Sequence, residues 1–269
     1  MGRTLRDIFR DNWVWRTQIW QLAKTELQKQ VRGAALGWVW LLITPAVYVF
    51  VFWFAISVGL RKGDISGGVP FIVWLTVGLM PWFFMQNMLT SGSNVYTRYT
   101  YLVNRLRFPI PVISSFFAAA NFLIFLLTQI IVLILIVLMK SPITIYALQA
   151  PIIAIVMYLF WTTWSMATSP LSAISRDFHN LIKAMSMPLF WLSGIIFNVT
   201  DIAIPWVQWV LAFNPVTFFA TSFRAALCDQ YWVWDKPQML WPFVAVFTLM
   251  FILAIRVQYR LGPEVADVL

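Results

Sequence analysis

Long runs of apolar residues without Asp, Glu, Lys or Arg alternate with short polar segments along most of the chain. Most of these runs exceed the roughly 20 residues that a helix needs to cross the hydrocarbon core of a bilayer. The pattern therefore predicts an all-α polytopic membrane protein with six transmembrane helices. We place the spans at residues 34–60, 70–89, 111–139, 148–174, 182–199 and 239–257.

The N-terminal segment, residues 1–32, has a different pattern. Apolar residues recur at intervals of three, four or seven, and basic residues lie elsewhere on the same helix. This periodicity predicts one amphipathic helix that lies in the membrane interface. No apolar block ends in a small-residue cleavage site, so we expect no cleavable signal peptide. The apolar stripe consists of Leu5, Phe9, Trp13, Trp20, Ala23, Leu27 and Val31.

A further apolar run, residues 202–223, is interrupted by Pro205 and Pro215 and closely follows the fifth predicted span. A full crossing here would carry Arg256 and Arg260 to the side of the membrane opposite the other basic segments. We therefore predict a re-entrant helical hairpin at residues 202–228, on the extracytoplasmic side between spans 5 and 6. Its broken backbone is expected to pack against protein rather than lipid.

Basic residues give the chain a net charge of +9 and are divided unevenly between the two sides of this topology. The N-terminal segment, the second and fourth loops and the C-terminal end hold 14 Lys and Arg, whereas the opposite loops hold 5. By the positive-inside rule both termini are cytoplasmic. Residues 33–258 then form a single transmembrane domain and residues 259–269 a cytoplasmic tail. Because the basic residues are scattered in short segments, we expect no nucleic-acid partner.

Residues that carry most enzyme chemistry are scarce. With one Cys and one His, Cys228 and His179, the sequence predicts neither a disulfide framework nor a metal site. The ten acidic residues fall in termini, loops or span ends, which argues against a proton relay or a catalytic carboxylate pair. No phosphate-cradling G-x-x-x-x-G-K-[ST] loop occurs. We expect a protein that is not an enzyme, holds no cofactor, and depends on a separate subunit that binds ATP and Mg.

Trp and Tyr crowd the ends of the predicted spans, which is typical of anchoring at the membrane–water interface. An alternative applies to the aromatic residues near the outer hairpin, which could stack on sugars or line an acyl chain. These residues are Trp206, Trp209, Tyr231, Trp232 and Trp234.

Six stretches, spread nearly from end to end, carry a family resemblance. They are RGAALGWVW (32–40), VPFIVWLTVGLMPWFF (69–84), NRLRFPIPV (104–112), SRDFHNL (175–181), NPVTFFATSFRAAL (214–227) and YRLGPEVADVL (259–269). Together they resemble the permease subunits of type-2 ATP-binding-cassette exporters of surface polysaccharides. The segments VGLRKGDISGGVPF and NPVTFFATSFRAAL, with the YWVWD that follows the latter, look most like teichoic acid translocation permeases.

The resemblance implies a homodimer of six-span subunits in a bacterial cytoplasmic membrane, docked on two copies of an ATP-binding-cassette ATPase. It also implies a lateral opening to the bilayer and a tunnel between the two permeases. Residues 97–109 match the family's coupling helix, which sits in a cleft of the ATPase. The contacts that we expect there are Asn104, Arg105, Arg107 and Phe108, although membrane topology alone could also account for the arginines.

Two further sets of residues gain roles from the same resemblance. Arg32 and Arg176 are expected to steer the diphosphate of a lipid-linked polymer, since a guanidinium can bond two phosphate oxygens at once. They could equally anchor helix ends. In the outer hairpin, Asn214 is expected to cap a helix that begins after a Pro turn. Arg224 is expected to be architectural, with contact to the emerging polymer as the alternative. Trp206, Trp209 and Trp232 would border an aromatic exit path.

The resulting hypothesis is the transmembrane subunit of an ATP-driven exporter that moves undecaprenyl-diphosphate-linked wall teichoic acid across the cytoplasmic membrane. The alternative is the same role for O-antigen or capsular polysaccharide. A polytopic glycosyltransferase is a remote alternative, because it would need acidic residues that converge at a membrane face, and only Asp177 lies at such an edge. A passive channel or scaffold would function without ATP.

Overall fold

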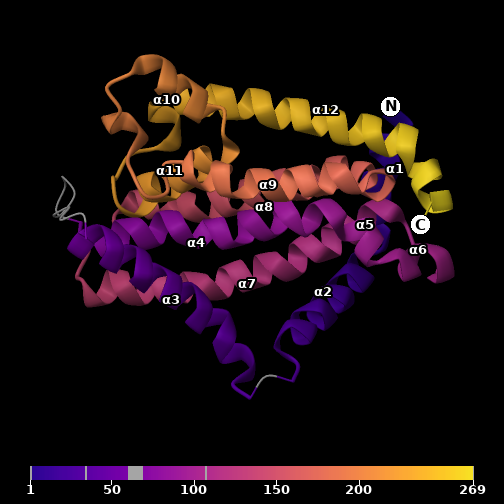
Figure 1. Ribbon diagram of the computed structural model, residues 1–269, viewed down its shortest axis with the longest axis horizontal. Helices are drawn as coiled ribbons and strands as arrows, with labels where there is room; N and C mark the ends of the chain where they lie inside the picture. Colours follow the sequence, from indigo (N-terminus) through magenta and orange to yellow (C-terminus); the bar gives the residue numbers. More distant parts are fainter. Residues whose placement is uncertain (1, 34, 60–68, 107, 269) are drawn as a thin grey trace.

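The structure is a computed structural model that describes residues 2–33, 35–59, 69–106 and 108–268. Every regular element within those ranges is a helix. Figure 1 shows most of the long helices lying side by side in one elongated bundle, with α1 and the last turns of α12 at the same end. We call this the terminal end, and the opposite end, which holds α10, the hairpin end.

Five segments are long and apolar enough to cross a membrane, which confirms the prediction of an all-α polytopic membrane protein. Each overlaps a predicted span. The segments are Gly37–Gly59, Phe71–Arg98, Ile110–Leu138, Ile145–Ile174 and Pro237–Gly262. Their principal helices are α3 (Trp40–Phe54), α4 (Phe71–Thr90), α7 (Ile110–Leu138), α8 (Ala150–Ile174) and α12 (Pro237–Val268).

The predicted span at residues 182–199 differs from the observed helix. α9 (Arg176–Trp191) begins earlier, has 16 residues and ends eight residues sooner. At 1.5 Å per residue it is about 24 Å long, and it is not among the five segments that pass the length and hydropathy test. The chain turns after it through Gly194, whose φ of +67° favours glycine. The carbonyls of Gly194 and Ile195 bond to Arg224 instead of continuing the helix.

The predicted hairpin at residues 202–228 coincides with α10 (Pro205–Ala212) and α11 (Pro215–Leu227), whose axes meet at 96°. Each helix starts with Pro, which is favourable in the first turn because its missing N–H would have no partner there. α11 packs against α4 and α8. The described helices therefore supply five spans, or six if this bent pair counts as one.

The N-terminal segment forms two helices rather than one, α1 (Gly2–Val14) and α2 (Arg16–Val31). Its apolar stripe divides between them: Phe9 and Trp13 of α1 are exposed, whereas Ala23 and Leu27 of α2 are buried. α2 packs on α7, so part of the stripe faces protein rather than the membrane interface. Figure 1 shows the chain leaving the bundle along α2 and returning along α3.

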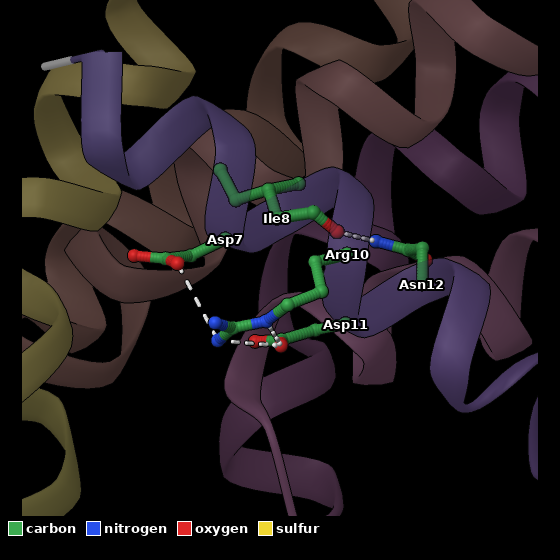
Figure 2. A network of polar contacts seen from close by, with 5 residues as sticks. All are labelled: Asp7, Ile8, Arg10, Asp11 and Asn12. Atoms are coloured by element: carbon green, nitrogen blue, oxygen red, sulfur yellow. Dashed lines mark hydrogen bonds and ion pairs between the residues drawn. The ribbon is translucent and has the colours of Figure 1, made fainter.

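The polar residues of α1 pair with one another, as Figure 2 shows. Arg10 forms ion pairs with Asp7 at 3.4 Å and Asp11 at 3.3 Å, and the Asn12 amide donates to the Ile8 carbonyl at 2.9 Å. The Arg10 and Asp7 side chains are more than half exposed. These contacts stay within one helix, so they tie α1 to no other element.

Candidate functional site

The segment matched to a coupling helix begins on a short helix, α5 (Val95–Arg98), that is fixed from the side of the bundle by polar contacts. The Tyr96 N–H donates to Ser169 Oγ of α8 at 2.9 Å. The Tyr96 hydroxyl accepts from Gln258 of α12 at 2.7 Å and from Ser114 of α7 at 3.4 Å. Because all of these groups are buried, α5 is held in one position relative to three long helices.

An ion pair joins α5 to the N-terminal helix α2. Arg98 Nη2 lies 2.7 Å from Glu26 Oε1, and Lys29 Nζ lies 3.6 Å from Glu26 Oε2. The Glu26 side chain is only 2% exposed, whereas Arg98 and Lys29 are about half exposed. A carboxylate this deeply buried needs its partners, because an unpaired buried charge is costly. Burial and the nearby Glu26 carboxylate also raise the pKa of the neighbouring Tyr99.

No sequence motif marks Glu26 and Arg98 as partners. The spacing of Glu26 and Lys29, three residues apart on one helix face, is the only local signal for this cluster. Arg98 lies 72 residues further along the chain, so only the folded chain brings it to Glu26.

The expected coupling residues lie at the terminal end, next to this ion pair. α6 (Thr100–Leu106) carries Asn104 and Arg105, whose side chains lie outside the description, and Arg107 is outside the described residues. Phe108 is buried, and its ring meets Trp15 edge-on with ring centroids 4.7 Å apart. Trp15 stands at the junction of α1 and α2, so both N-terminal helices and the expected coupling segment meet here.

The two arginines expected to steer a diphosphate, Arg32 and Arg176, are both exposed. Arg32 directly follows α2, and Arg176 is the first residue of α9. Figure 1 shows the turn after α2 well outside the bundle, away from the terminal end where α9 begins beside η3 (Gly92–Asn94). The structure therefore does not bring these two arginines together in one site.

Arg224 of α11 is one of the largest fully enclosed side chains of the protein, with 2% of its surface exposed. Its guanidinium donates to three backbone carbonyls: Trp74 at 3.1 Å, Gly194 at 2.7 Å, and Ile195. It also lies 3.2 Å from the centroid of the Trp74 ring. This placement fits the architectural interpretation, since the side chain joins α11 to α4 and to the turn after α9.

Arg224 also changes one expectation drawn from the sequence. The sequence places Arg224 in the outer hairpin and predicts no charge in the middle of a span. The structure keeps Arg224 in that hairpin but encloses its side chain, on the helix α11 that packs against α4 and α8. Its partners are main-chain carbonyls, which every residue possesses, so no pattern of side chains could have identified them.

The structure confirms that Asn214 caps a helix. Its side-chain oxygen accepts from the Val216 N–H at 3.0 Å, directly before the Pro215 turn of α11. Its amide nitrogen donates to the carbonyls of Leu189 and Leu192, at 3.2 and 3.1 Å. One side chain thus starts α11 and closes the end of α9, so it fixes where the hairpin returns into the bundle.

The outer aromatic residues fall into two groups. Trp206 and Trp209 of α10 are exposed. Trp232 stacks on Trp234, with centroids 4.7 Å apart and planes 8° from parallel, and it meets Tyr146 edge-on. The second group is therefore packed partly on itself, while the two α10 tryptophans leave their rings available.

The chain has one cysteine and one histidine, Cys228 and His179. Cys228, directly after α11, is buried, and burial raises the pKa of its thiol to about 12. His179 lies near the start of α9, where its Nδ1 is 3.2 Å from Ser93 Oγ. Among the residues that the structure describes, no group of three or more His, Cys, Asp or Glu could hold a metal ion.

Comparisons with known proteins place these features in context. The model of the ABC-2 type transporter family matches residues 17–228. The chain is 21% identical over 250 residues to the O-antigen export system permease protein RfbA of Myxococcus xanthus, and the match covers 93% of each chain. A protein of the same description from Klebsiella pneumoniae is 23% identical over 205 residues, which cover 76% of this chain and 77% of the relative.

Proposed function

The chain belongs to the ABC-2 type transporter family, and we propose that it is the membrane-spanning permease of an ATP-driven exporter of a lipid-linked surface polysaccharide. The observation that carries this proposal is the similarity to an O-antigen export permease over 93% of both chains. The family match alone covers residues 17–228. The wider similarity also takes in parts of the chain beyond that range, so it supports a shared role for the whole subunit.

The relatives favour O-antigen over teichoic acid as the polymer. The teichoic acid interpretation depends on residues 58–71 and on residues 214–227 with the aromatic segment that follows them, which together cover a small part of the chain. By contrast, the curated relatives that cover three quarters or more of the chain are named for O-antigen export. We therefore propose an O-antigen-type polysaccharide carried on a lipid diphosphate, and we keep wall teichoic acid as the alternative that the same assay decides.

The energy would come from a separate ATPase, because the sequence contains no phosphate-binding loop of its own. The unequal distribution of basic residues supports a cytoplasmic terminal end and an external hairpin end. In this arrangement α6 faces the ATPase, with ATP and Mg bound by that partner, and the buried ring of Phe108 supports α6 from behind through Trp15. The Glu26–Arg98 ion pair and the Tyr96 contacts would carry the motion of the ATPase into α2, α7, α8 and α12.

Two copies of the chain, each with its ATPase, would enclose the path of the polymer. The exposed rings of Trp206 and Trp209 suit stacking on sugars at the exit. Trp232, already stacked on Trp234, would border the same path. Arg32 and Arg176 remain proposed as separate cationic contacts for the diphosphate on its way to the entrance.

The function is tested by reconstituting the chain with its ATPase in proteoliposomes that contain lipid-linked O-polysaccharide or, in a parallel set, lipid-linked teichoic acid. We expect ATP-dependent movement of the O-polysaccharide across the bilayer, measured by its accessibility to a glycosidase on the far side. Movement of teichoic acid alone would favour the alternative polymer. Failure to move either polymer with an active ATPase present would contradict the proposal.

The coupling role is tested separately with the double variant Arg105→Glu/Arg107→Glu. Reversing these charges should reduce both recovery of the ATPase with the permease and export of the polymer. Arg256→Glu/Arg260→Glu is the matched control, since it reverses two charges on α12 that have not been assigned to the coupling segment. A complex that forms normally and exports normally with the first pair reversed would rule out this role.

A further inference from the structure

A polar cavity of about 400 Å³ opens at the terminal end, between the end of α4 and the first turns of α9. Its wall contains the cationic side chains of Arg98 and Lys183 together with the imidazole of His179. No acidic residue lines it among the residues that the structure describes. The cavity lies where the apolar segment Phe71–Arg98 ends, which is the level of lipid headgroups if this segment spans the membrane.

A second pocket of about 260 Å³ has a different lining. It is bordered by α1, α8 and α12 and is lined mainly by apolar side chains, Phe9, Leu159 and Phe251 among them. None of the described residues that line it is charged. The two pockets therefore suit different chemistry: the second fits a hydrocarbon chain, and the first fits an anion.

The two permanent cations of the cavity retain capacity for a ligand. Arg98 uses Nη2 for Glu26, and a guanidinium has five N–H donors. Within the described part of the chain, no carboxylate lies within ion-pair distance of Lys183. Glu26 thus holds Arg98 at the edge of the cavity, while Lys183 brings a charge that no described residue neutralises.

His179 lines the cavity, and one of its ring nitrogens is in contact with Ser93. The Ser93 hydroxyl lies 2.7 Å from the Thr90 carbonyl and 3.2 Å from His179 Nδ1. Nδ1 thus has a protein partner, whereas Nε2 bonds to no described residue and is left for another partner. Burial and the Lys183 ammonium lower the pKa of His179, an effect that a bound anion would oppose.

Smaller polar side chains form the rest of the lining. The side chains of Ser91, Asn94 and Thr97 make no hydrogen bond to other described residues, although each lines the cavity. Hydroxyl and amide groups next to cations are the donors that phosphate oxygens require. The site thus combines charge with several directed donors, which suits a compact anion with many oxygens better than a single carboxylate.

We propose that this cavity, with Arg98, Lys183 and His179 as its principal contacts, binds a diphosphate group at the terminal end of the bundle. The proposal rests on the proposed function for the lipid that would carry the diphosphate. The lining residues recognise the diphosphate group and not the lipid attached to it. The experiment therefore distinguishes two sources of this group, a lipid diphosphate and a free diphosphate anion.

The single histidine of the chain provides the measurement. The full chain, purified without a histidine tag and labelled at histidine Cε1, is placed in phosphatidylcholine nanodiscs and titrated with pH by NMR. Saturating inorganic pyrophosphate or farnesyl diphosphate should raise the pKa of His179 by about one unit, because an adjacent anion favours the imidazolium. The titration is repeated after addition of the unlabelled ATPase.

Lys183→Gln removes one cation while keeping a side chain of similar length. We expect it to weaken diphosphate binding about tenfold, as the loss of one charge-assisted hydrogen bond would, and Lys183→Arg to restore most of the affinity. Lys24→Gln on α2 is the matched control, because Lys24 does not line the cavity. The histidine signal in the absence of ligand checks that each variant keeps the fold around α9.

Each outcome decides the matter. A response to both probes supports the site. A response to farnesyl diphosphate alone also supports it and assigns it to a lipid-borne diphosphate. A response to pyrophosphate alone supports the site with a soluble source. No response to either, or equal losses in Lys183→Gln and Lys24→Gln, overturns it. Loss of ATPase recovery in Lys183→Gln without any diphosphate response also overturns it, in favour of a protein contact.

Failure of this proposal and failure of the proposed function can be told apart. If the wild-type chain exports polymer while Lys183→Gln neither binds less diphosphate nor exports less, the cavity has no such role and the function stands. If diphosphate binds but the wild-type chain with its ATPase moves no polymer, the site stands and the function fails.

Discussion

The two ends of the bundle each contain a buried charged group, and they hold it in different ways. At the hairpin end, Arg224 is enclosed completely and bonds to main-chain carbonyls and to the face of Trp74. At the terminal end, Glu26 is equally buried, but both of its cationic partners are half exposed. One charge is held by backbone carbonyls, and the other by half-exposed side chains that water and salt reach.

This difference indicates where the molecule can change shape. A guanidinium on three carbonyls of two separate segments cannot leave without exposing all of them, because buried carbonyls without donors are costly. Glu26 has two half-exposed partners, so one of them can turn to water while the other keeps the buried carboxylate paired. The hairpin end should therefore move as a unit, whereas the terminal end can rearrange, as a contact with an ATPase would require.

The largest expected effect comes from Arg224→Met, which keeps much of the volume but removes the charge and every donor. Three carbonyls would lose their partner, and we expect a loss of about 3 kcal/mol in the free energy of unfolding. Thermal unfolding in nanodiscs measures it. Lys236→Met is the control, because Lys236 is partly exposed and its ammonium lies 4.3 Å from the centroid of the Tyr231 ring. Equal losses of unfolding free energy in the two variants would contradict the proposed difference between the two ends.

A somewhat smaller effect is expected from Gly78→Ala on α4. A Cβ at position 78 would lie 2.7 Å from Arg224 Nε and still closer to other guanidinium atoms, so we expect a loss of about 2 kcal/mol from overpacking. In an Arg224→Ala background the same change should cost almost nothing, which a double-mutant cycle measures. Gly262→Ala, with open space around it, is the control, and a cycle without coupling would contradict this account.

Glu26→Gln should have a modest effect at the terminal end. It removes the charge that Arg98 and Lys29 share, and solvent screening limits the expected loss to about 1 kcal/mol. The loss should shrink as salt rises, whereas that of Arg224→Met should not. Asp7→Asn is the control, because the Asp7–Arg10 pair of Figure 2 is exposed and lies within one helix. A salt-independent loss at Glu26 would show that this end is as rigid as the other.

The smallest effect concerns pH. Because the folded state lowers the pKa of His179 below its ordinary value, the unfolded chain binds the proton more readily. The corresponding stabilisation is present above the unfolded pKa, about 6.5, and is lost as pH falls through the folded value. The midpoint temperature of thermal unfolding should therefore fall slightly more between pH 7.5 and pH 5.5 for the wild type than for His179→Gln. An equal fall in the two proteins would show that His179 does not contribute to the pH dependence of stability.

The sequence predicts the helices better than their contacts. Runs of apolar residues locate α4, α7 and α8 within a few residues, because hydropathy and length leave few alternatives in a membrane protein. The predicted fifth span at 182–199 extends past the observed end of α9 at Trp191, after which the chain turns through Gly194. The glycine is a local signal for the turn, but nothing in residues 182–199 encodes Arg224, the partner of the Gly194 and Ile195 carbonyls.

The candidate site was predictable to a similar degree. The Asn214 cap follows from a local rule about residues before a Pro turn, and the structure confirms it. The meeting of Glu26 with Arg98, and of Arg98 with Lys183 and His179 around one cavity, depends on helices that are distant in sequence. Local periodicity says which face of a helix is polar, but not which other polar face it meets.

The burial of Cys228 has a practical consequence. Thiol reagents attack the thiolate, and a buried thiol with a pKa of about 12 offers almost none at neutral pH. Since the chain has no other cysteine, the native protein should be silent toward maleimides. A cysteine placed at Trp20 or Trp206 would then be the sole reactive position, and a membrane-impermeant maleimide would reveal directly which end of the bundle faces the cell interior.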